Sequence, residues 1–244
     1  MEWRERDGVR WLEAELPAGR AAFSTRIGGV SDPPYDALNV AILTGDDPAS
    51  VKQNRHRLAG VLGRDPDGVV MARQVHGSDL LRHDGPQRPR VFADAVASPE
   101  RADAQATSSP ELTPLVVTAD CLPVAMSGPH GVVMAHCGWR GLAAGLVAEA
   151  AGAVGAEAAA IGPGIGPCCY EVGEEVLAEF DSIDGVASGR MLDLPAVARA
   201  LLERAGVAAV ESAELCTSCN PELFYSHRRD GERTGRQAGL AWRV

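Results

Sequence analysis

The chain has 244 residues, of which 45% are hydrophobic, 23% charged and 5% aromatic, and its net charge is −10. This length provides ample material for a core, either in one large domain or in two small ones. The acidic charge argues against non-specific nucleic-acid binding, which needs a basic surface. Lys52 is the only lysine and follows no glycine-rich segment, which excludes a P-loop.

No segment of the sequence indicates export or membrane insertion. Five of the first seven residues are charged and no apolar run follows them, and no stretch approaches the roughly 18 apolar residues of a membrane span. We therefore expect a soluble, cytoplasmic protein whose six cysteines are reduced. Their positions do not give two matched Cys-x-x-Cys pairs, so the spacing argues against a zinc ribbon.

The predicted elements mix strands and helices. They are a strand over 21–25 before a turn at Gly28-Gly29, a helix from Asp47-Pro48 to Leu62, a strand over 68–75, a loop over 84–114, strands over 115–126 and 131–137, an alanine-rich helix over 141–155, a strand over 157–161, a helix from Asp193 to near Gly206, and a strand over 207–212. Strands and helices do not alternate strictly, and no domain boundary stands out. We therefore predict a single-domain α/β (α+β) sandwich with mixed β-sheets over residues 1–244.

The turn-rich segment 127–131 joins two predicted strands, which indicates a hairpin. With the turn centred near position 128.5, Cys121 and His136 fall directly opposite each other, on one face of the sheet and about 5 Å apart. A thiolate and an imidazole at that separation form either a pair of metal ligands or a nucleophile–base pair. A one-residue slip would place them on opposite faces, and Pro123 favours a bulge nearby.

His76 ends the preceding strand and is followed by glycine, so it is a candidate third ligand. Two histidines, one cysteine and an open fourth position suit catalytic zinc, which lowers the pKa of bound water to about 7. The alternative is that all three are ordinary residues at strand ends.

Two arginines beside glycine turns are candidate anion ligands. Arg140 lies in Cys-Gly-Trp-Arg-Gly, a turn that opens the predicted helix over 141–155, and Arg26 ends the first predicted strand. The alternatives are a structural turn for Arg140 and a surface charge for Arg26. Cys216-Thr-Ser-Cys219 is either half a metal site or a redox pair, without an evident second half. Cys168-Cys169 is interpreted as packing.

Seven segments in the same order resemble the laccase-domain, or multicopper-polyphenol-oxidase-like, family, whose members are also called purine nucleoside phosphorylase or peptidoglycan editing factor proteins. The segments are Phe-Ser-Thr-Arg-x-Gly-Gly (23–29), Gln-Val-His-Gly (74–77), Thr-Ala-Asp-Cys-Leu-Pro (118–123), Ala-His-x-Gly-Trp-Arg-Gly (135–141), Gly-Pro-x-Ile-x-x-Cys-x-Tyr-Glu-Val-Gly (162–173), Phe-Tyr-Ser-His-Arg-Arg-Asp-Gly (224–231) and Thr-Gly-Arg (234–236).

The resemblance implies that His76, Cys121 and His136 hold a zinc ion and act in catalysis. Cys137 departs from the small residue usual at its position, which raises a question about oxidation or alternative metal ligation. A multicopper oxidase needs about ten histidines, largely in His-x-His pairs. This chain has six histidines and no such pair, so copper is the less favoured metal.

The activity implied by the resemblance is phosphorolysis of purine nucleosides (adenosine, inosine, guanosine and methylthioadenosine) together with deamination of adenosine. Zinc-activated water attacking C6 of adenine would give inosine and ammonia. Phosphate held by arginines such as Arg26 and Arg140 would attack C1′, and Gln74 is placed to contact the substrate. The partners are therefore a nucleoside and phosphate, with no nucleic acid and no membrane, for a monomer or a homodimer.

Three alternatives remain open at this point. The first is a cysteine hydrolase that edits peptidoglycan precursors, with Cys121 as nucleophile and His136 as base. The others are a polyphenol oxidase and a non-enzymatic metal-binding protein.

Overall fold

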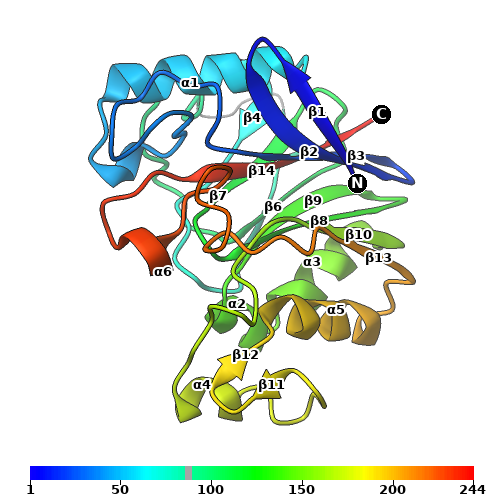
Figure 1. Ribbon diagram of the computed structural model, residues 1–244. Helices are drawn as coiled ribbons and strands as arrows, with labels where there is room; N and C mark the ends of the chain where they lie inside the picture. The colour runs from blue at the N-terminus through cyan, green and yellow to red at the C-terminus, as the bar shows by residue number, and fades with distance from the viewer. Residues whose placement is uncertain (86–89) are drawn as a thin grey trace.

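Two six-stranded mixed sheets pack face to face in the computed structural model, which describes residues 1–85 and 90–244 (Figure 1). The first sheet has the order β1 (Glu2–Arg6), β2 (Val9–Leu16), β3 (Gly19–Ser24), β14 (Gln237–Arg243), β7 (Thr113–Thr118) and β4 (Val69–Val70). The second has the order β13 (Ala209–Ser212), β10 (Ala158–Ile161), β8 (Leu122–Gly128), β9 (Gly131–Cys137), β6 (Ala104–Thr107) and β5 (Leu80–Arg82). Parallel pairs β4–β7, β10–β13 and β5–β6 join the antiparallel ones.

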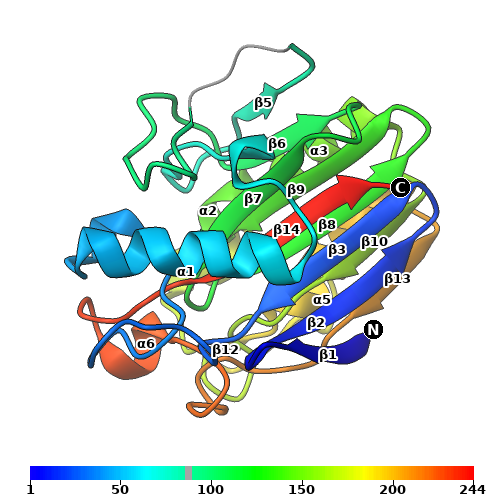
Figure 2. The ribbon, with the colours of Figure 1, turned by 90° about the horizontal axis from the view of Figure 1, so that it is seen from above.

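Helices cover the outer face of each sheet. The helix α1 (Pro48–Val61) lies across the first sheet, as the view from above shows (Figure 2). Helices α2 (Trp139–Ala143), α3 (Leu146–Val154) and α5 (Leu194–Arg204) pack against the second. The remaining short elements are α4 (Glu174–Ala178), α6 (His227–Asp230), the 3-10 turns Ile42–Thr44 and Pro66–Gly68, and the hairpin of β11 (Ala187–Ser188) with β12 (Met191–Leu192). The predicted α/β sandwich with mixed sheets is confirmed.

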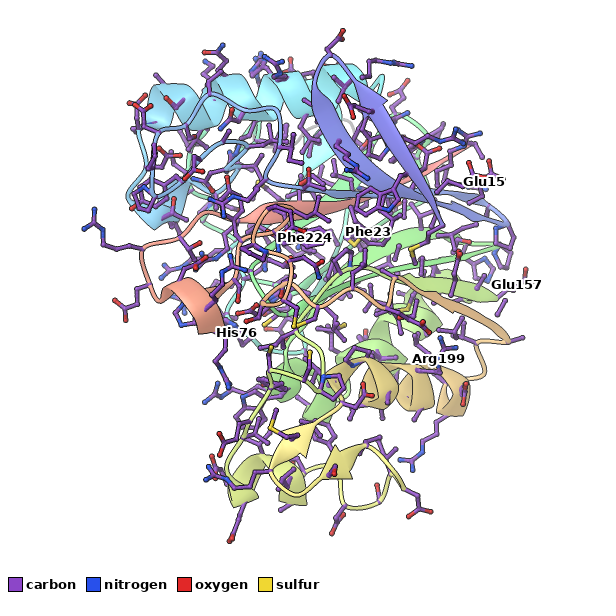
Figure 3. The ribbon with its side chains drawn as sticks, in the orientation of Figure 1. Glu15, Phe23, His76, Glu157, Arg199 and Phe224 are labelled. Atoms are coloured by element: carbon purple, nitrogen blue, oxygen red, sulfur yellow. The ribbon has the colours of Figure 1, made fainter. Side chains whose placement is uncertain are left out.

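Side chains from the facing sheet surfaces form the central core. Phe23 of β3 is 1% exposed and lies between the sheets (Figure 3). A Cβ on Gly162 would approach the Phe23 ring to 2.3 Å, and one on Gly164 would approach Leu122 Cδ2 to 2.4 Å. Packing therefore explains the glycines at 162 and 164.

Local capping explains where the two long predicted helices begin. The Asp47 carboxylate accepts a hydrogen bond from the Ser50 backbone N–H at 2.9 Å, and Asp193 accepts one from Ala196 at 2.9 Å. Both helices were predicted from these residues. The predicted helix over 141–155 is instead two helices, because the chain turns at Gly145, where φ is +88°.

Two strand predictions were wrong in their bounds. The predicted strand over 115–126 is β7 and β8, which belong to different sheets, and the chain crosses between them at 119–121. The predicted strand over 68–75 forms a strand only at β4, and the segment 84–114, predicted as a loop, contains β6. Residues 86–89 of that segment lie outside the described residues. Among the described residues, no helix is long and apolar enough to cross a membrane.

Candidate metal centre

Three side chains from separate segments meet at one end of the sandwich. His76 lies in the loop after β4, Cys121 comes directly before β8, and His136 belongs to β9. One ligand atom from each lies within 4.8 Å of the other two, and the two imidazole rings are 4.9 Å apart at 73°. His76, labelled in Figure 3, lines the same pocket as residues of α2 and α6. The arrangement could hold a metal ion.

The hairpin that carries two of these residues has a register different from the predicted one. Gly128 pairs with Gly131 and Pro123 pairs with His136, so the paired numbers sum to 259, whereas the prediction used 257. The position opposite Cys121 is therefore Gly138. Because the error is an even number of residues, Cys121 and His136 still share a face as diagonal neighbours.

Asp103, which the sequence analysis did not single out, organises both histidines. Its Oδ1 accepts a hydrogen bond from His136 Nδ1 at 2.8 Å. The backbone N–H groups of Val75, His76 and Gly77 donate to the same carboxylate at 3.1, 3.0 and 2.8 Å. His76 has a φ of +61°, a conformation that a non-glycine residue adopts only when its surroundings impose it. Asp103 thus fixes the His76 loop and leaves His136 Nε2 available to a ligand.

The buried charges of the centre shift each other's pKa values. Burial favours the neutral form of Asp103, but hydrogen bonds from His136 and the backbone hold the pKa of this carboxyl below its usual value. Burial also raises the pKa of the Cys121 thiol. The charge of His136 and hydrogen bonds from both histidines have the opposite and larger effect, so the pKa is lowered to about 6. Burial lowers the pKa of His136, whereas Cys121 and Asp103 raise it to about 9. In the metal-free chain, the centre therefore favours a thiolate beside an imidazolium.

A pocket of about 400 Å³ opens beside the three candidate ligands. Its cationic lining consists of Arg140, Arg228 and Arg236. Arg228 Nη1 donates to the Glu171 carbonyl at 2.9 Å, and its guanidinium lies 5.2 Å from the centre of the Tyr170 ring. Arg140, which the sequence analysis selected, reaches the pocket.

The sequence analysis did not assign Arg228 or Arg236 to the site. It quoted both residues only within the tail motifs of the resemblance. Their segment follows the candidate ligands by about a hundred residues. The only signal for both was their place in the two tail segments of the resemblance.

The other two predicted substrate ligands have different surroundings. Arg26 does not line this pocket: its guanidinium donates to the Asp36 carbonyl at 2.7 Å and the Pro221 carbonyl at 3.1 Å, and stacks on Tyr225. Gln74 does line the pocket, but its amide exchanges two hydrogen bonds with the Val117 backbone, at 2.7 and 2.8 Å. The substrate contacts of both residues stay predictions.

The remaining cysteines are arranged differently from their interpretation above. Cys137 points away from the candidate ligands into the core beneath α2 and α3, where burial raises the pKa of its thiol. It is not part of the ligand group. The Cys216–Cys219 pair does have a second half: Cys168 and Cys169 lie against it, with all four sulfur atoms within 4.8 Å of one another. The interpretation of Cys168 and Cys169 as packing did not include this convergence with Cys216 and Cys219.

Known proteins resemble this chain along nearly its whole length. A family model described as multi-copper polyphenol oxidoreductase laccase matches residues 20–244. The purine nucleoside phosphorylase YfiH of Shigella flexneri is 40% identical over 244 residues, which covers 94% of this chain and 96% of that protein. The crystal structure of the Bacillus licheniformis hypothetical protein YfiH has a TM-score of 0.90 at 31% identity and covers 99% of both chains. That of YlmD from Geobacillus stearothermophilus has a TM-score of 0.84 at 31% identity, over 98% of this chain and 97% of that one.

Proposed function

This chain belongs to the multi-copper polyphenol oxidoreductase laccase family, and we propose that it is a zinc-dependent purine nucleoside phosphorylase with adenosine deaminase activity. The observation that carries the proposal is the pocket in which His76, Cys121 and His136 face the arginines Arg140 and Arg228. Such a pocket combines a candidate metal centre with arginine side chains suited to binding an anion. Relatives named purine nucleoside phosphorylase support it.

The donor set favours zinc over copper. Two imidazoles and one thiolate with an open position are typical of catalytic zinc, and the hydrogen bond from His136 to Asp103 is the kind of contact that orients a zinc-bound histidine. A multicopper centre needs many more histidines than the six of this chain. When bound, zinc supplies a Lewis acid that polarises an oxygen and makes water a better nucleophile near neutral pH.

For phosphorolysis, we assign the arginines to the phosphate. Arg140, Arg228 and Arg236 would hold the dianion by charge-assisted hydrogen bonds and place one of its oxygens against C1′ of the nucleoside. The new bond forms between this oxygen and C1′ as the bond from C1′ to the purine nitrogen breaks. The purine leaves with the electron pair and takes up a proton, which gives the free base and the pentose 1-phosphate.

Two aromatic side chains are suited to the nucleoside. Trp139 and Tyr170 line the same pocket, and an aromatic face stacks on a purine of any substitution. This arrangement fits several purine nucleosides. In the deamination, water oxygen replaces the C6 amino group of adenosine and ammonia is released, so this reaction needs no phosphate.

One observation favours a second candidate function. Cys121, His136 and Asp103 form the series of nucleophile, base and orienting carboxylate that a cysteine hydrolase uses. In that case, the metal-free protein would be the active form and would hydrolyse an amide, such as one in a peptidoglycan precursor.

Chromatography of adenosine incubations separates these functions. With phosphate, the proposal predicts adenine and pentose 1-phosphate; without phosphate, it predicts inosine. Cys121→Ala should lose both reactions, whereas Arg228→Ala should lose mainly the phosphate-dependent one. The proposal fails if zinc-loaded protein forms neither product. Amidase activity that survives removal of the metal would establish the cysteine hydrolase instead.

A further inference from the structure

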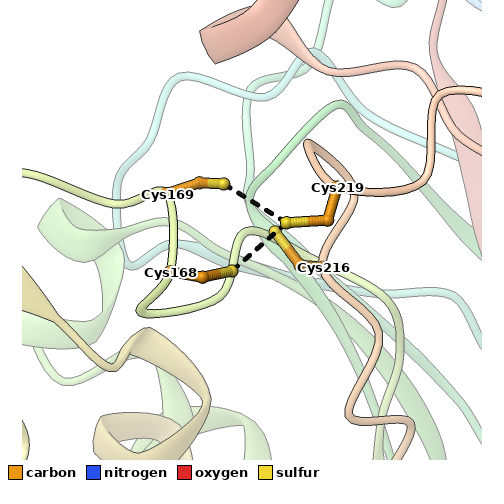
Figure 4. Close-up of side chains that lie close together, drawn as sticks. All are labelled: Cys168, Cys169, Cys216 and Cys219. Atoms are coloured by element: carbon orange, nitrogen blue, oxygen red, sulfur yellow. Dashed lines mark hydrogen bonds between the residues drawn. The ribbon is translucent and has the colours of Figure 1, made fainter.

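Four cysteines from two distant loops converge at a second place on the chain. Cys168 and Cys169 lie in the turn after the 162–167 loop, and Cys216 and Cys219 lie in the turn that follows β13 (Figure 4). Cys219 Sγ is 3.4 Å from both Cys168 Sγ and Cys169 Sγ. All four sulfur atoms lie within 4.8 Å of one another, and all four thiols are free.

These spacings match four thiolates around one metal ion. Zinc–sulfur bonds of about 2.3 Å in a tetrahedron place the sulfur atoms about 3.8 Å apart. This separation is close to the 3.4 Å contacts of Cys219 Sγ and lies inside the 4.8 Å within which all four sulfur atoms fall. A disulfide would use only one of the two neighbours of Cys219. The convergence of all four side chains on one point is instead the geometry of a shared ligand (Figure 4).

The backbone around the cluster is also suited to negatively charged thiolate sulfur atoms. The Gly166 N–H donates to Cys216 Sγ at 3.3 Å, a hydrogen bond that strengthens when the sulfur is a thiolate. A Cβ on Gly166 would lie 3.3 Å from Cys216 Cβ and 3.5 Å from Cys168 Sγ. Glycine therefore keeps the loop close to the cluster without crowding the sulfur atoms.

We propose that Cys168, Cys169, Cys216 and Cys219 bind one zinc ion in a structural tetrathiolate site, separate from the His76, Cys121 and His136 centre. A soft ion with tetrahedral preference suits four thiolates, and a closed set of four protein ligands is typical of structural zinc. The site goes beyond the proposed function, because its occupancy does not depend on what the pocket binds.

The tetrathiolate site joins two loops that hold the residue next to Cys121. Gly164 pairs with Cys216 in a parallel bridge. The Ile165 N–H donates to the Asp120 carbonyl at 2.7 Å, and Thr217 Oγ1 donates to the Asp120 carboxylate at 2.6 Å. Zinc would therefore cross-link the two loops that hold Asp120, and so fix the position of the adjacent Cys121.

Counting metal ions tests the site without any activity assay. Native mass spectrometry of wild-type protein produced with zinc under reducing conditions should find about two zinc ions per chain. The double variant Cys168→Ser/Cys219→Ser should retain one, and Cys121→Ala should retain the other. Cys137→Ala, which removes a thiol outside both groups, is the matched control and should keep two.

Cobalt loading gives a second measurement if the double variant is unstable. Cobalt bound to wild-type protein should give thiolate-to-cobalt charge-transfer absorption as intense as expected for four thiolate ligands. Cys121→Ala should preserve most of this absorption. The proposal is overturned if wild-type protein binds a single zinc that Cys121→Ala abolishes. It is also overturned if the reduced, zinc-grown protein contains a disulfide within the cluster. Loss of nucleoside activity with both zinc ions present would instead refute only the proposed function.

Discussion

The carboxylate of Asp103 accepts a hydrogen bond from Nδ1 of His136 at 2.8 Å while three consecutive backbone N–H groups donate to the same carboxylate. One side chain therefore determines the ring orientation of His136 and the left-handed backbone of His76. This double role makes Asp103 the residue through which the two candidate histidine ligands are coupled.

We expect Asp103→Asn to lower metal affinity at the His76, Cys121 and His136 centre by about 10- to 100-fold. The amide can still accept from His136 with its oxygen, but its NH₂ group then faces the donating N–H groups of Val75 and Gly77. Competition with a zinc chelator would measure the loss. Asp79→Asn, a change at the nearby residue whose backbone carbonyl accepts from Asp103 N–H, is the control. Equal zinc affinities in the Asp103 variant and wild type would contradict the role assigned to Asp103.

The lowered pKa of Cys121 predicts a thiol that reacts in mildly acidic solution once the metal is removed. A thiol with a pKa of about 6 is deprotonated above that pH, whereas an ordinary cysteine, with a pKa of about 8.5, is not. Alkylation of Cys121 in the metal-free protein should therefore rise through a midpoint near pH 6. Peptide mass spectrometry after short iodoacetamide pulses would follow each cysteine separately.

Cys137 supplies an internal control in the same experiment, because it is buried and its pKa is raised. It should stay unlabelled across the range. His136→Ala should move the Cys121 midpoint upward, since the charge of His136 lowers the thiol pKa. A midpoint that did not move would show that another group stabilises the thiolate.

The sequence was sufficient to predict that Cys121 and His136 lie close together, although the predicted register was wrong. Side chains alternate with a period of two, so a two-residue error leaves both residues on one face. The break at 119–121 could not be predicted, because an apolar run looks the same whether its strands share a sheet or belong to two. The crossing depends on Asp120, whose φ is +98°.

Contacts between distant segments account for the rest of what was missed. Asp103 reaches His136 only because β6 pairs with β9, and nothing in the sequence around Asp103 indicates this pairing. Likewise, Cys168 meets Cys219 across about fifty residues through the bridge between Gly164 and Cys216. The spacing of the cysteines along the chain therefore gave no sign that Cys168 and Cys169 lie beside the Cys-x-x-Cys pair. The pairing of backbone segments brings them together.

In the proposed phosphorolysis, Arg228 should contribute to phosphate binding more than to nucleoside binding. Removing a charge-assisted hydrogen bond costs about 1.5–3 kcal/mol, so Arg228→Ala should raise KM for phosphate roughly 10- to 100-fold. Its effect on the proposed deamination, which uses no phosphate, should be small. Arg233→Ala is the matched control, because Arg233 is exposed on the same segment and does not line the pocket. If both variants changed KM for phosphate equally, general charge and not a specific contact would explain the effect.

Gly138 provides a test of the metal centre that leaves the backbone unchanged. Its φ of −81° and ψ of 165° suit alanine, but a Cβ there would lie 3.0 Å from Cys121 Sγ and 3.2 Å from His76 Cδ2. These contacts would displace two candidate ligands by a few tenths of an ångström, beyond the roughly 0.2 Å that a metal site tolerates. Gly138→Ala should therefore weaken zinc binding on the order of 10-fold, measured by chelator competition.

A glycine of α3 supplies the matched control for this substitution. Gly152 is exposed in the middle of the helix, and a Cβ there would meet nothing within 4 Å. Gly152→Ala should leave zinc binding unchanged and raise the free energy of unfolding by about 0.5–1 kcal/mol, because alanine loses less backbone entropy on folding. Denaturant unfolding of both variants would separate a local effect on the ligands from a general loss of stability. If Gly138→Ala bound zinc as tightly as wild type, Cys121 and His76 would not hold the ion in the arrangement described.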